Sequence, residues 1–93
     1  MNVPLQIAER LTPKELKLFD LVVSKPGTSR AQAMEFLYPG VAAPPDPATI
    51  RVLLSRIRTK LSTLGISIVM ERGYGYRLTE SSCAALARIQ EAA

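Results

Sequence analysis

The sequence predicts a small, mainly helical domain in which three helices are followed by a β-hairpin. Three segments, 12–25, 29–38 and 46–64, begin with helix-capping residues and continue with apolar residues at helical spacing. After residue 65 the apolar residues alternate, and a glycine-rich turn then leads into a second short extended run. The 93 residues, 47% of them apolar, are enough for one domain with one core.

The first eleven residues precede the predicted helices. Val3, Leu5 and Ile7 alternate with polar residues or proline, which favours a short strand or an extended arm over residues 1–11. No basic region followed by an apolar block opens the chain, so we expect no export signal.

The first helix has a clear start. Thr12 is a good N-cap, Pro13 suits the first helical position, and Glu15 stands three residues after the cap. Together they predict a capping box, in which each side chain accepts a hydrogen bond from the other residue's backbone N–H. Lys25-Pro26-Gly27 ends the helix.

The second helix is predicted from the N-cap Ser29 to about Tyr38, where Pro39-Gly40 ends it. The next residues, up to Pro45, contain no periodicity and are expected to form a loop.

The third helix starts at Asp46-Pro47 by the same cap-then-proline rule, and Gly65 is expected to end it in the left-handed conformation. Apolar residues at intervals of four and three predict one buried face: Ile50, Leu54, Ile57, Leu61 and Leu64. The basic residues lie away from that face, and a second stripe contains Thr49, Leu53, Arg56 and Lys60.

The hairpin and a tail complete the chain. Ile66, Ile68 and Met70 predict the first strand, residues 73–75 the turn and residues 76–78 the returning strand. A short helix is expected from Ser82 to Glu91. Three helices with a terminal hairpin predict a winged helix-turn-helix over residues 12–79, whose wing is the hairpin, with a tail helix in residues 80–93.

Positive charge is concentrated in one third of the chain. Residues 49–77 hold six basic residues and one acidic residue, a net charge of +5, whereas the rest of the chain has a net charge of −1. Concentrated positive charge indicates a nucleic-acid partner. The alternative is a solvated basic face of a helix.

The composition argues against several other classes of function. Histidine is absent and Cys83 is the single cysteine, so neither a zinc site nor a His-assisted nucleophile is expected. The carboxylates do not pair at acid–base spacing, so we expect no enzyme and no cofactor. No apolar run is long enough to span a membrane. Cys83 is expected to be a small buried or half-buried side chain on a helix, in a cytoplasmic, nucleoid-associated protein.

Three motifs resemble one family. Residues 46–61 resemble the recognition helix of the OmpR/PhoB-type output domains of bacterial response regulators, which carries a Thr-Val-x-Val-x-Ile-x-Arg-Leu-Arg-x-Lys-Leu pattern. Residues 72–78, Arg-Gly-Tyr-Gly-Tyr-Arg-Leu, are similar to the wing of that family, and residues 11–16 match the start of its first helix. The resemblance covers about residues 11–79, with the motifs in order and in register.

The resemblance implies a role for individual residues in binding double-stranded DNA. It implies a base contact in the major groove for Arg56, phosphate contacts for Thr49 and Arg58, and entry of Arg72 into the minor groove. Tyr76 matches a tyrosine that touches the DNA backbone, and Tyr38 stands where the family has a phosphate-contacting Trp. The loop 39–45 corresponds to the segment through which activators of the family touch RNA polymerase.

The residues themselves add two candidates and several alternatives. Lys60 is expected to bring charge to the phosphates, and Arg51 either does the same or is a solvated helix charge. Tyr76 is either a phosphate contact or an aromatic side chain at the edge of the core. Arg77 is expected to pair with Glu71 or Glu80.

The chain also departs from the family pattern. Only eleven residues precede Thr12, where the family has a four-stranded sheet and usually a receiver domain, so control by aspartyl phosphorylation is not expected. Leu53 replaces a DNA-facing His, Ser55 replaces a basic residue, and Arg51 replaces a frequent Asp.

These features predict a small bacterial or phage-type transcription regulator that binds double-stranded DNA and contacts RNA polymerase. One alternative is a winged-helix protein-interaction module that binds RNA polymerase or sequesters another regulator without reading DNA. Another is an architectural binder without sequence preference. A homodimer on adjacent DNA half-sites is expected. The tail, with Leu86 and Ile89, is either a cover for the core or a dimer contact.

Overall fold

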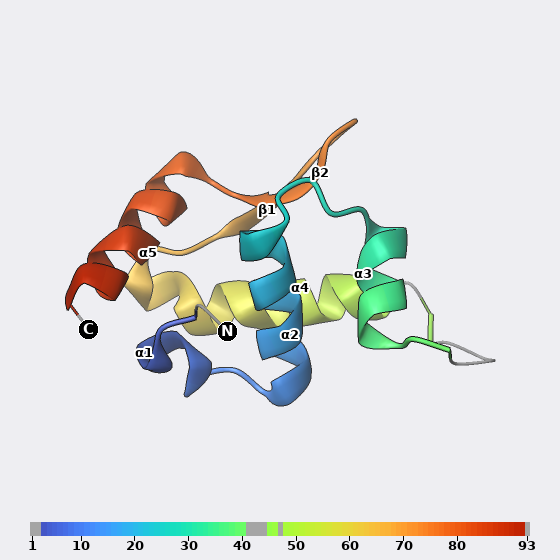
Figure 1. Ribbon diagram of the computed structural model, residues 1–93, viewed down its shortest axis with the longest axis horizontal. Coiled ribbons are helices and arrows are strands. Elements are labelled where there is room, and N and C mark those ends of the chain that lie inside the picture. Colours follow the sequence, from blue (N-terminus) through green and yellow to red (C-terminus); the bar gives the residue numbers. More distant parts are fainter. Residues whose placement is uncertain (1–2, 41–44, 47, 93) are drawn as a thin grey trace.

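The computed structural model describes residues 3–40, 45–46 and 48–92 (Figure 1). Within these ranges the predicted order of three helices, a hairpin and a tail helix is confirmed. The expected loop residues 41–44, and Pro47 at the start of the third predicted helix, lie outside the described residues. The elements are α1 (Leu5–Ala8), α2 (Pro13–Ser24), α3 (Arg30–Leu37), α4 (Ala48–Leu61), the 3-10 turn η1 (Ser62–Leu64), β1 (Ile68–Glu71), β2 (Gly75–Leu78) and α5 (Glu80–Ala92).

The core lies where α2 crosses α4, with α3 packed against both helices (Figure 1). The predicted apolar face of α4 is buried almost throughout. It meets large side chains of α2 that are themselves excluded from solvent: Leu18, Phe19 and Val22. The burial of this apolar surface is the main source of stability and fixes which face of α4 remains outside.

Two capping boxes start α2 and α3. The predicted box at α2 is confirmed: the Glu15 amide donates to Thr12 Oγ1 at 3.4 Å, and the Thr12 amide donates to Glu15 Oε1 at 3.0 Å. Ser29 and Gln32 form the same arrangement at α3, with distances of 3.1 and 2.8 Å. Each box satisfies backbone N–H groups that have no partner inside the helix.

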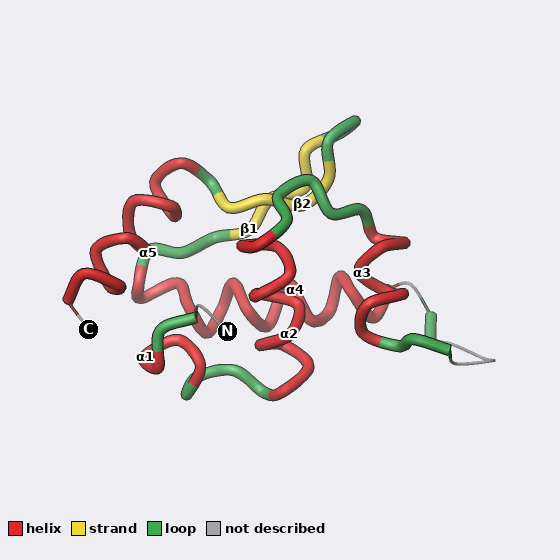
Figure 2. The backbone as a smooth tube through the Cα atoms, viewed as in Figure 1, coloured by secondary structure: helices red, strands yellow, loops and turns green. Residues whose placement is uncertain are grey.

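The hairpin is joined to the turn between α2 and α3. β1 and β2 pair in antiparallel register from Ile68↔Leu78 to Glu71↔Gly75. Tyr76 of β2 also pairs with Thr28, in addition to its pairing with β1. The Tyr76 amide donates to the Thr28 carbonyl and the Gly27 amide donates to the Tyr76 carbonyl, both at 2.9 Å. The wing is therefore hydrogen-bonded to the turn that precedes α3. Figure 2 shows the strands lying next to that turn.

The prediction of a short strand or an extended arm over residues 1–11 is wrong for residues 5–8. Residues 5–8 form one helical turn, α1, because Pro4 has a φ of −58° and its carbonyl accepts the amides of Ile7 and Ala8. Ile7 is fully buried, whereas Leu5 remains 71% exposed, so the two do not share a strand face.

The tail forms a helix, as predicted, although α5 begins at Glu80 rather than Ser82. Ala85 and Leu86 are buried in the core, so this helix covers the core. Ser82 is also buried; its Oγ accepts the Ser67 amide at 2.7 Å and lies 2.6 Å from Thr79 Oγ1.

Two further predictions concern single residues near the tail. Gly65 ends the 3-10 turn that follows α4 with a φ of +75°, which confirms the expected left-handed stop. Cys83 lies on a helix, as predicted, but it is exposed. The inward side of α5 is taken by Ser82, Ala85 and Leu86, and the helical spacing turns Cys83 away from it.

Candidate nucleic-acid interface

Helix α4 carries its basic residues on two sides of its buried face. At about 100° per residue, Arg51 and Arg58 lie close together on one side, and Arg56 and Lys60 lie on the other. By this spacing Arg56 and Arg58 project about 160° apart around the helix axis. They belong to different parts of any interface that α4 forms.

The side of α4 that carries Arg58 faces a concavity of about 610 Å³ that also involves α3 and the wing. Four arginines from three parts of the fold line it, and no acidic residue does. The rest of the lining is formed by Leu54, Met70, Gly73 and Tyr76. Four guanidinium groups around one concavity repel each other, and an anionic ligand relieves that repulsion. The arginines are Arg30, Arg51, Arg58 and Arg72.

Arg58 is fixed in place by the wing. Its Nε donates to the Ile68 carbonyl at 2.8 Å, where β1 begins. A guanidinium group has further N–H donors, so this hydrogen bond orients the side chain and still leaves donors for a ligand. The same hydrogen bond ties the wing to α4.

Arg30 is a site residue that the sequence analysis missed. It is the first residue of α3 and lies outside the basic segment 49–77, which drew attention to α4 and the hairpin. One sequence signal could have identified it. The cap at Ser29 makes Arg30 the first residue of a helix, where a positive charge is unfavourable against the helix dipole and therefore suggests a functional role.

Arg56 and Lys60 differ in their exposure and in their charged partners. Arg56 is exposed on α4. Lys60 Nζ lies 2.6 Å from Glu15 Oε1, and the Glu15 side chain is fully buried. The charge that was predicted to face phosphate therefore has an internal partner, and it connects α4 to α2.

The protonation of Glu15 is set by opposing influences. Burial raises its pKa. The hydrogen bonds from Lys60 and from the Thr12 amide, together with the positive charges of Lys60 and Arg56, lower the pKa by more than burial raises it. The net result is a pKa below the ordinary value, so Glu15 is ionised at neutral pH. Its Oε2 atom is buried without a hydrogen-bond partner among the described residues.

The predicted aromatic contacts lie in different surroundings. Tyr76 is only 6% exposed and belongs to the core, which agrees with the predicted aromatic side chain at the edge of the core. It also lines the arginine concavity, and its contact with phosphate stays a prediction. Tyr38, half-buried at the end of α3, is not part of that concavity; Lys14 Nζ lies 4.0 Å above the centre of its ring. Thr49 is half-buried in the first turn of α4, and its amide donates to the Asp46 carbonyl at 2.8 Å.

Leu53 belongs to the buried face of α4. It is 6% exposed and packs in the core, so its predicted separation from that face, in a second stripe with Arg56 and Lys60, is wrong. An apolar side chain at this position is drawn into the core. Ser55 is exposed, and Arg77 pairs with Glu71 at 2.6 Å, the first of its two predicted partners.

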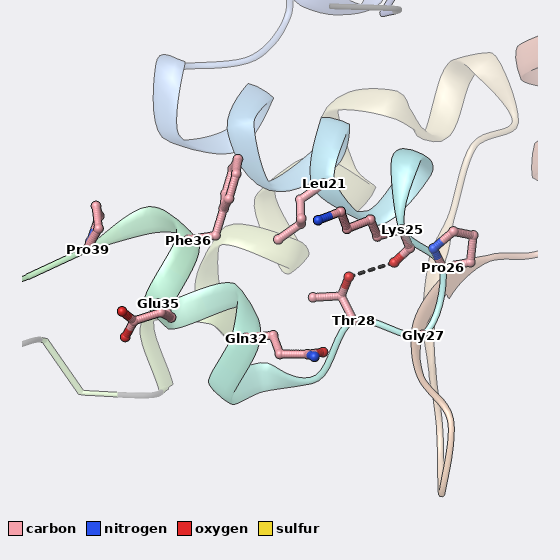
Figure 3. Close-up of a pocket in the computed structure, with 9 residues that line it drawn as sticks. All are labelled: Leu21, Lys25, Pro26, Gly27, Thr28, Gln32, Glu35, Phe36 and Pro39. Atoms are coloured by element: carbon pink, nitrogen blue, oxygen red, sulfur yellow. Dashed lines mark hydrogen bonds between the residues drawn. The ribbon is translucent and has the colours of Figure 1, made fainter.

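A second groove, of about 690 Å³, lies between the end of α2, the following turn and α3 (Figure 3). It contains none of the predicted DNA-binding residues. Phe36 of α3 lies across from Leu21 of α2, and the lining includes both Lys25 and Glu35. With one charge of each sign, this groove lacks the electrostatic character of a phosphate site.

Within the described residues, neither a metal-binding cluster nor a membrane-spanning helix is present. No group of three His, Cys, Asp or Glu side chains within residues 3–40, 45–46 and 48–92 is placed to hold a metal ion. No helix in those ranges has the length and apolar character needed to cross a bilayer.

Comparison with known proteins identifies the family. Residues 7–78 match the family described as transcriptional regulatory protein, C terminal, while neither the curated proteins nor the solved structures gave a match. The matched range contains the three core helices and the wing, and α5 lies beyond it. This family comprises DNA-binding regulatory domains and is not a class of enzymes. The chain belongs to it: it is a winged-helix domain of the OmpR/PhoB type, a family of DNA-binding domains of transcription regulators.

Proposed function

We propose that this domain is a sequence-specific transcription regulator that inserts α4 into the major groove and the wing into the minor groove. The observation that carries this proposal is the concavity lined by Arg30, Arg51, Arg58 and Arg72. It lies beside the exposed face of α4, so phosphate binding there would bring that face against the bases.

In this arrangement Arg56 reads a base. It stands on the outward crest of α4 together with Val52, Ser55 and Thr59, all exposed. A guanidinium group donates two parallel hydrogen bonds to O6 and N7 of guanine, a geometry that lysine lacks. The buried face on the opposite side of α4 sets the angle at which Arg56 is presented.

The arginines of the concavity have two roles in this proposal: some contact DNA phosphates, and one enters the minor groove. Arg30, Arg51 and Arg58 supply phosphate contacts, because they come from two helices that lie along the concavity. Arg72 stands at the turn of the wing and reaches into a narrow minor groove, where the negative potential is strongest. Lys60 is paired with Glu15 by one hydrogen bond, and the further N–H donors of its ammonium group supply the charge that we expect against phosphate.

Two partners complete the proposal. Two copies bind adjacent half-sites, since one domain of this size covers little DNA. α5 packs on its own core, so the contact between copies depends on DNA rather than on Leu86.

The loop 39–45 contacts RNA polymerase; residues 41–44 lie outside the described residues.

The test is selection of bound sites from a random duplex pool by the full chain, followed by titration of the selected duplex at several salt concentrations. We expect an enriched sequence and an affinity that falls steeply with salt. Binding without enrichment would replace sequence recognition with architectural binding.

A protein-interaction module is the second candidate. It is favoured by two positions of α4: Leu53 is buried, and Ser55 is uncharged where the family often has a basic residue. Absence of duplex binding even at low salt would select this candidate.

A further inference from the structure

The C-terminal helix creates a groove that the family match does not include. Gln6 and Arg10 from the α1 region, η1 and α5 line a surface depression of about 420 Å³. Its α5 residues, Ala85, Arg88 and Ile89, all lie beyond residue 78, where the match ends. Figure 1 shows α1 and α5 at one end of the molecule, away from α3 and from the tip of the wing. A ligand seated there leaves the proposed DNA-binding face open.

The groove has an apolar floor and a positively charged rim. Leu64 and Ile89 are only partly buried and lie at its surface beside Ala85. Arg10 and Arg88 are both exposed, and no carboxylate lines the groove.

The two rim arginines are not neutralised by any of the described residues. Arg10 Nη1 lies 3.3 Å from Thr63 Oγ1, and neither arginine has an ion-pair partner in the part of the chain that the structure describes. Glu91 is one helical turn from Arg88 on α5 without forming such a pair. The positive potential of the rim is therefore available to a ligand.

We propose that this groove docks an amphipathic, acidic helix of another protein. Its apolar residues would cover Leu64 and Ile89, and its carboxylates would pair with Arg10 and Arg88. The positively charged rim favours an acidic partner because opposite charges attract. The open groove with its apolar floor suits a helix that presents apolar residues one turn apart on one face.

The test uses the full chain saturated with duplex DNA, so that the arginine concavity is occupied. The probe is a labelled peptide of about 15 residues with leucine on one helical face and glutamate elsewhere, a length at which isolated helices become marginally stable. Its counterpart carries lysine in place of glutamate. Backbone amide signals locate the site, and fluorescence anisotropy gives the affinity.

We expect the acidic peptide to shift the amide signals of Thr63, Leu64 and Ile89, and the lysine peptide to leave them unchanged. Arg88→Glu and Arg10→Glu should each weaken binding of the acidic peptide by about fivefold to tenfold. Lys17→Glu reverses an exposed charge of α2 outside the groove and should leave the affinity unchanged.

Three results would overturn the proposal. The first is no binding of the acidic peptide. The second is a response confined to the arginine concavity, for example at Met70 and Gly73. The third is amide shifts at the groove that depend on protein concentration without peptide, because a second copy of the chain would then be the occupant. None of these results bears on DNA recognition by α4.

Discussion

At the scale of single residues, Arg56 and Lys60 show how neighbouring charges on one side of α4 divide their roles. Lys60 and Arg56 are one helical turn apart, yet Lys60 is held by a buried carboxylate while Arg56 is exposed. Such a pair contributes to stability only as long as both partners are present, because a buried charge without a partner is costly.

Arg56→Ala should weaken binding to the selected DNA sequence by about 1–3 kcal/mol, because a bidentate contact with guanine is lost. The midpoint of thermal unfolding should change little, since the side chain is exposed. Titration of the selected duplex and a thermal melt check both results. Arg56→Lys is the matched control that keeps the charge, and it should also lose discrimination. Unchanged discrimination in both variants would remove Arg56 from base recognition.

Glu15 makes stability depend on pH. Its folded-state pKa lies below the ordinary value of 4.5, so its ionised form stabilises the fold above that pH, and the contribution is lost as the pH falls through the folded-state pKa. Denaturant unfolding of the wild type between neutral pH and about pH 3 should therefore show a fall in the free energy of unfolding at the acid end.

Glu15→Gln should lower stability at neutral pH by about 1–3 kcal/mol, since Lys60 loses its charged partner and Gln offers a weaker acceptor. The acid-induced fall should be smaller in this variant than in the wild type. An equal fall in both proteins would show that other carboxylates carry the pH dependence.

At the scale of elements, the wing depends on the close approach of two backbones. A Cβ atom at Gly75 would lie 2.4 Å from the Gly27 carbonyl oxygen and 2.7 Å from that of Thr28, and Gly75 has a φ of +124°. The glycine of the wing motif is therefore required by the contact with the α2–α3 turn as well as by the hairpin turn itself.

Gly75→Ala should lower the free energy of unfolding by more than about 2 kcal/mol, because the backbone contact must open and the residue is strained. Gly73→Ala is the control: its φ is +81°, but a Cβ atom there meets no atom within 4 Å, so only a cost of about 1 kcal/mol is expected. Denaturant unfolding of both variants measures the difference. Equal losses would mean that the contact with Gly27 contributes nothing.

Local sequence patterns predicted most of the helices and strands. They could not show which residues far apart in the sequence contact each other. The capping box at Thr12 and the stop at Gly65 depend on a few neighbouring residues, so spacing alone identified them. The pair Glu15–Lys60 joins residues 45 positions apart, and the burial of Leu53 depends on what packs against α4. The turn at α1 was missed because the alternation of three apolar residues says nothing about whether a neighbouring strand exists.

The candidate site was predicted in part for the same reason. Arg51, Arg58 and Arg72 were named from α4 and the hairpin, and the fold brings them to one concavity. Arg30 joins them only through tertiary packing of α3, which no local pattern reveals. Arg56 and Arg58, two residues apart in the predicted recognition helix, fall on different sides of it.

At the scale of the whole molecule, the charges of the concavity decide how affinity depends on salt. Arg51→Ala and Arg58→Ala should each reduce affinity for all duplex sequences alike and lower the slope of log affinity against log salt by about 1. Arg58→Ala should also cost about 0.5–1.5 kcal/mol of stability through the hydrogen bond to the Ile68 carbonyl, whereas Arg51→Ala should not. Titrations at several salt concentrations with melts of each variant separate the effects. Wild-type slopes in both variants would exclude phosphate contacts there.

The bridge between Thr28 and Tyr76 has a consequence for the DNA itself. The wing is hydrogen-bonded to the turn that precedes α3, and Arg58 is bonded to β1, so the wing is tied to the α2–α3 turn and to α4. In the proposed docking, the spacing between the major-groove and minor-groove contacts is then a property of the protein, and the duplex would bend or narrow to meet it. Sequences differ in how readily they deform. We therefore expect base preferences to extend to base pairs between the two contacts that no side chain touches.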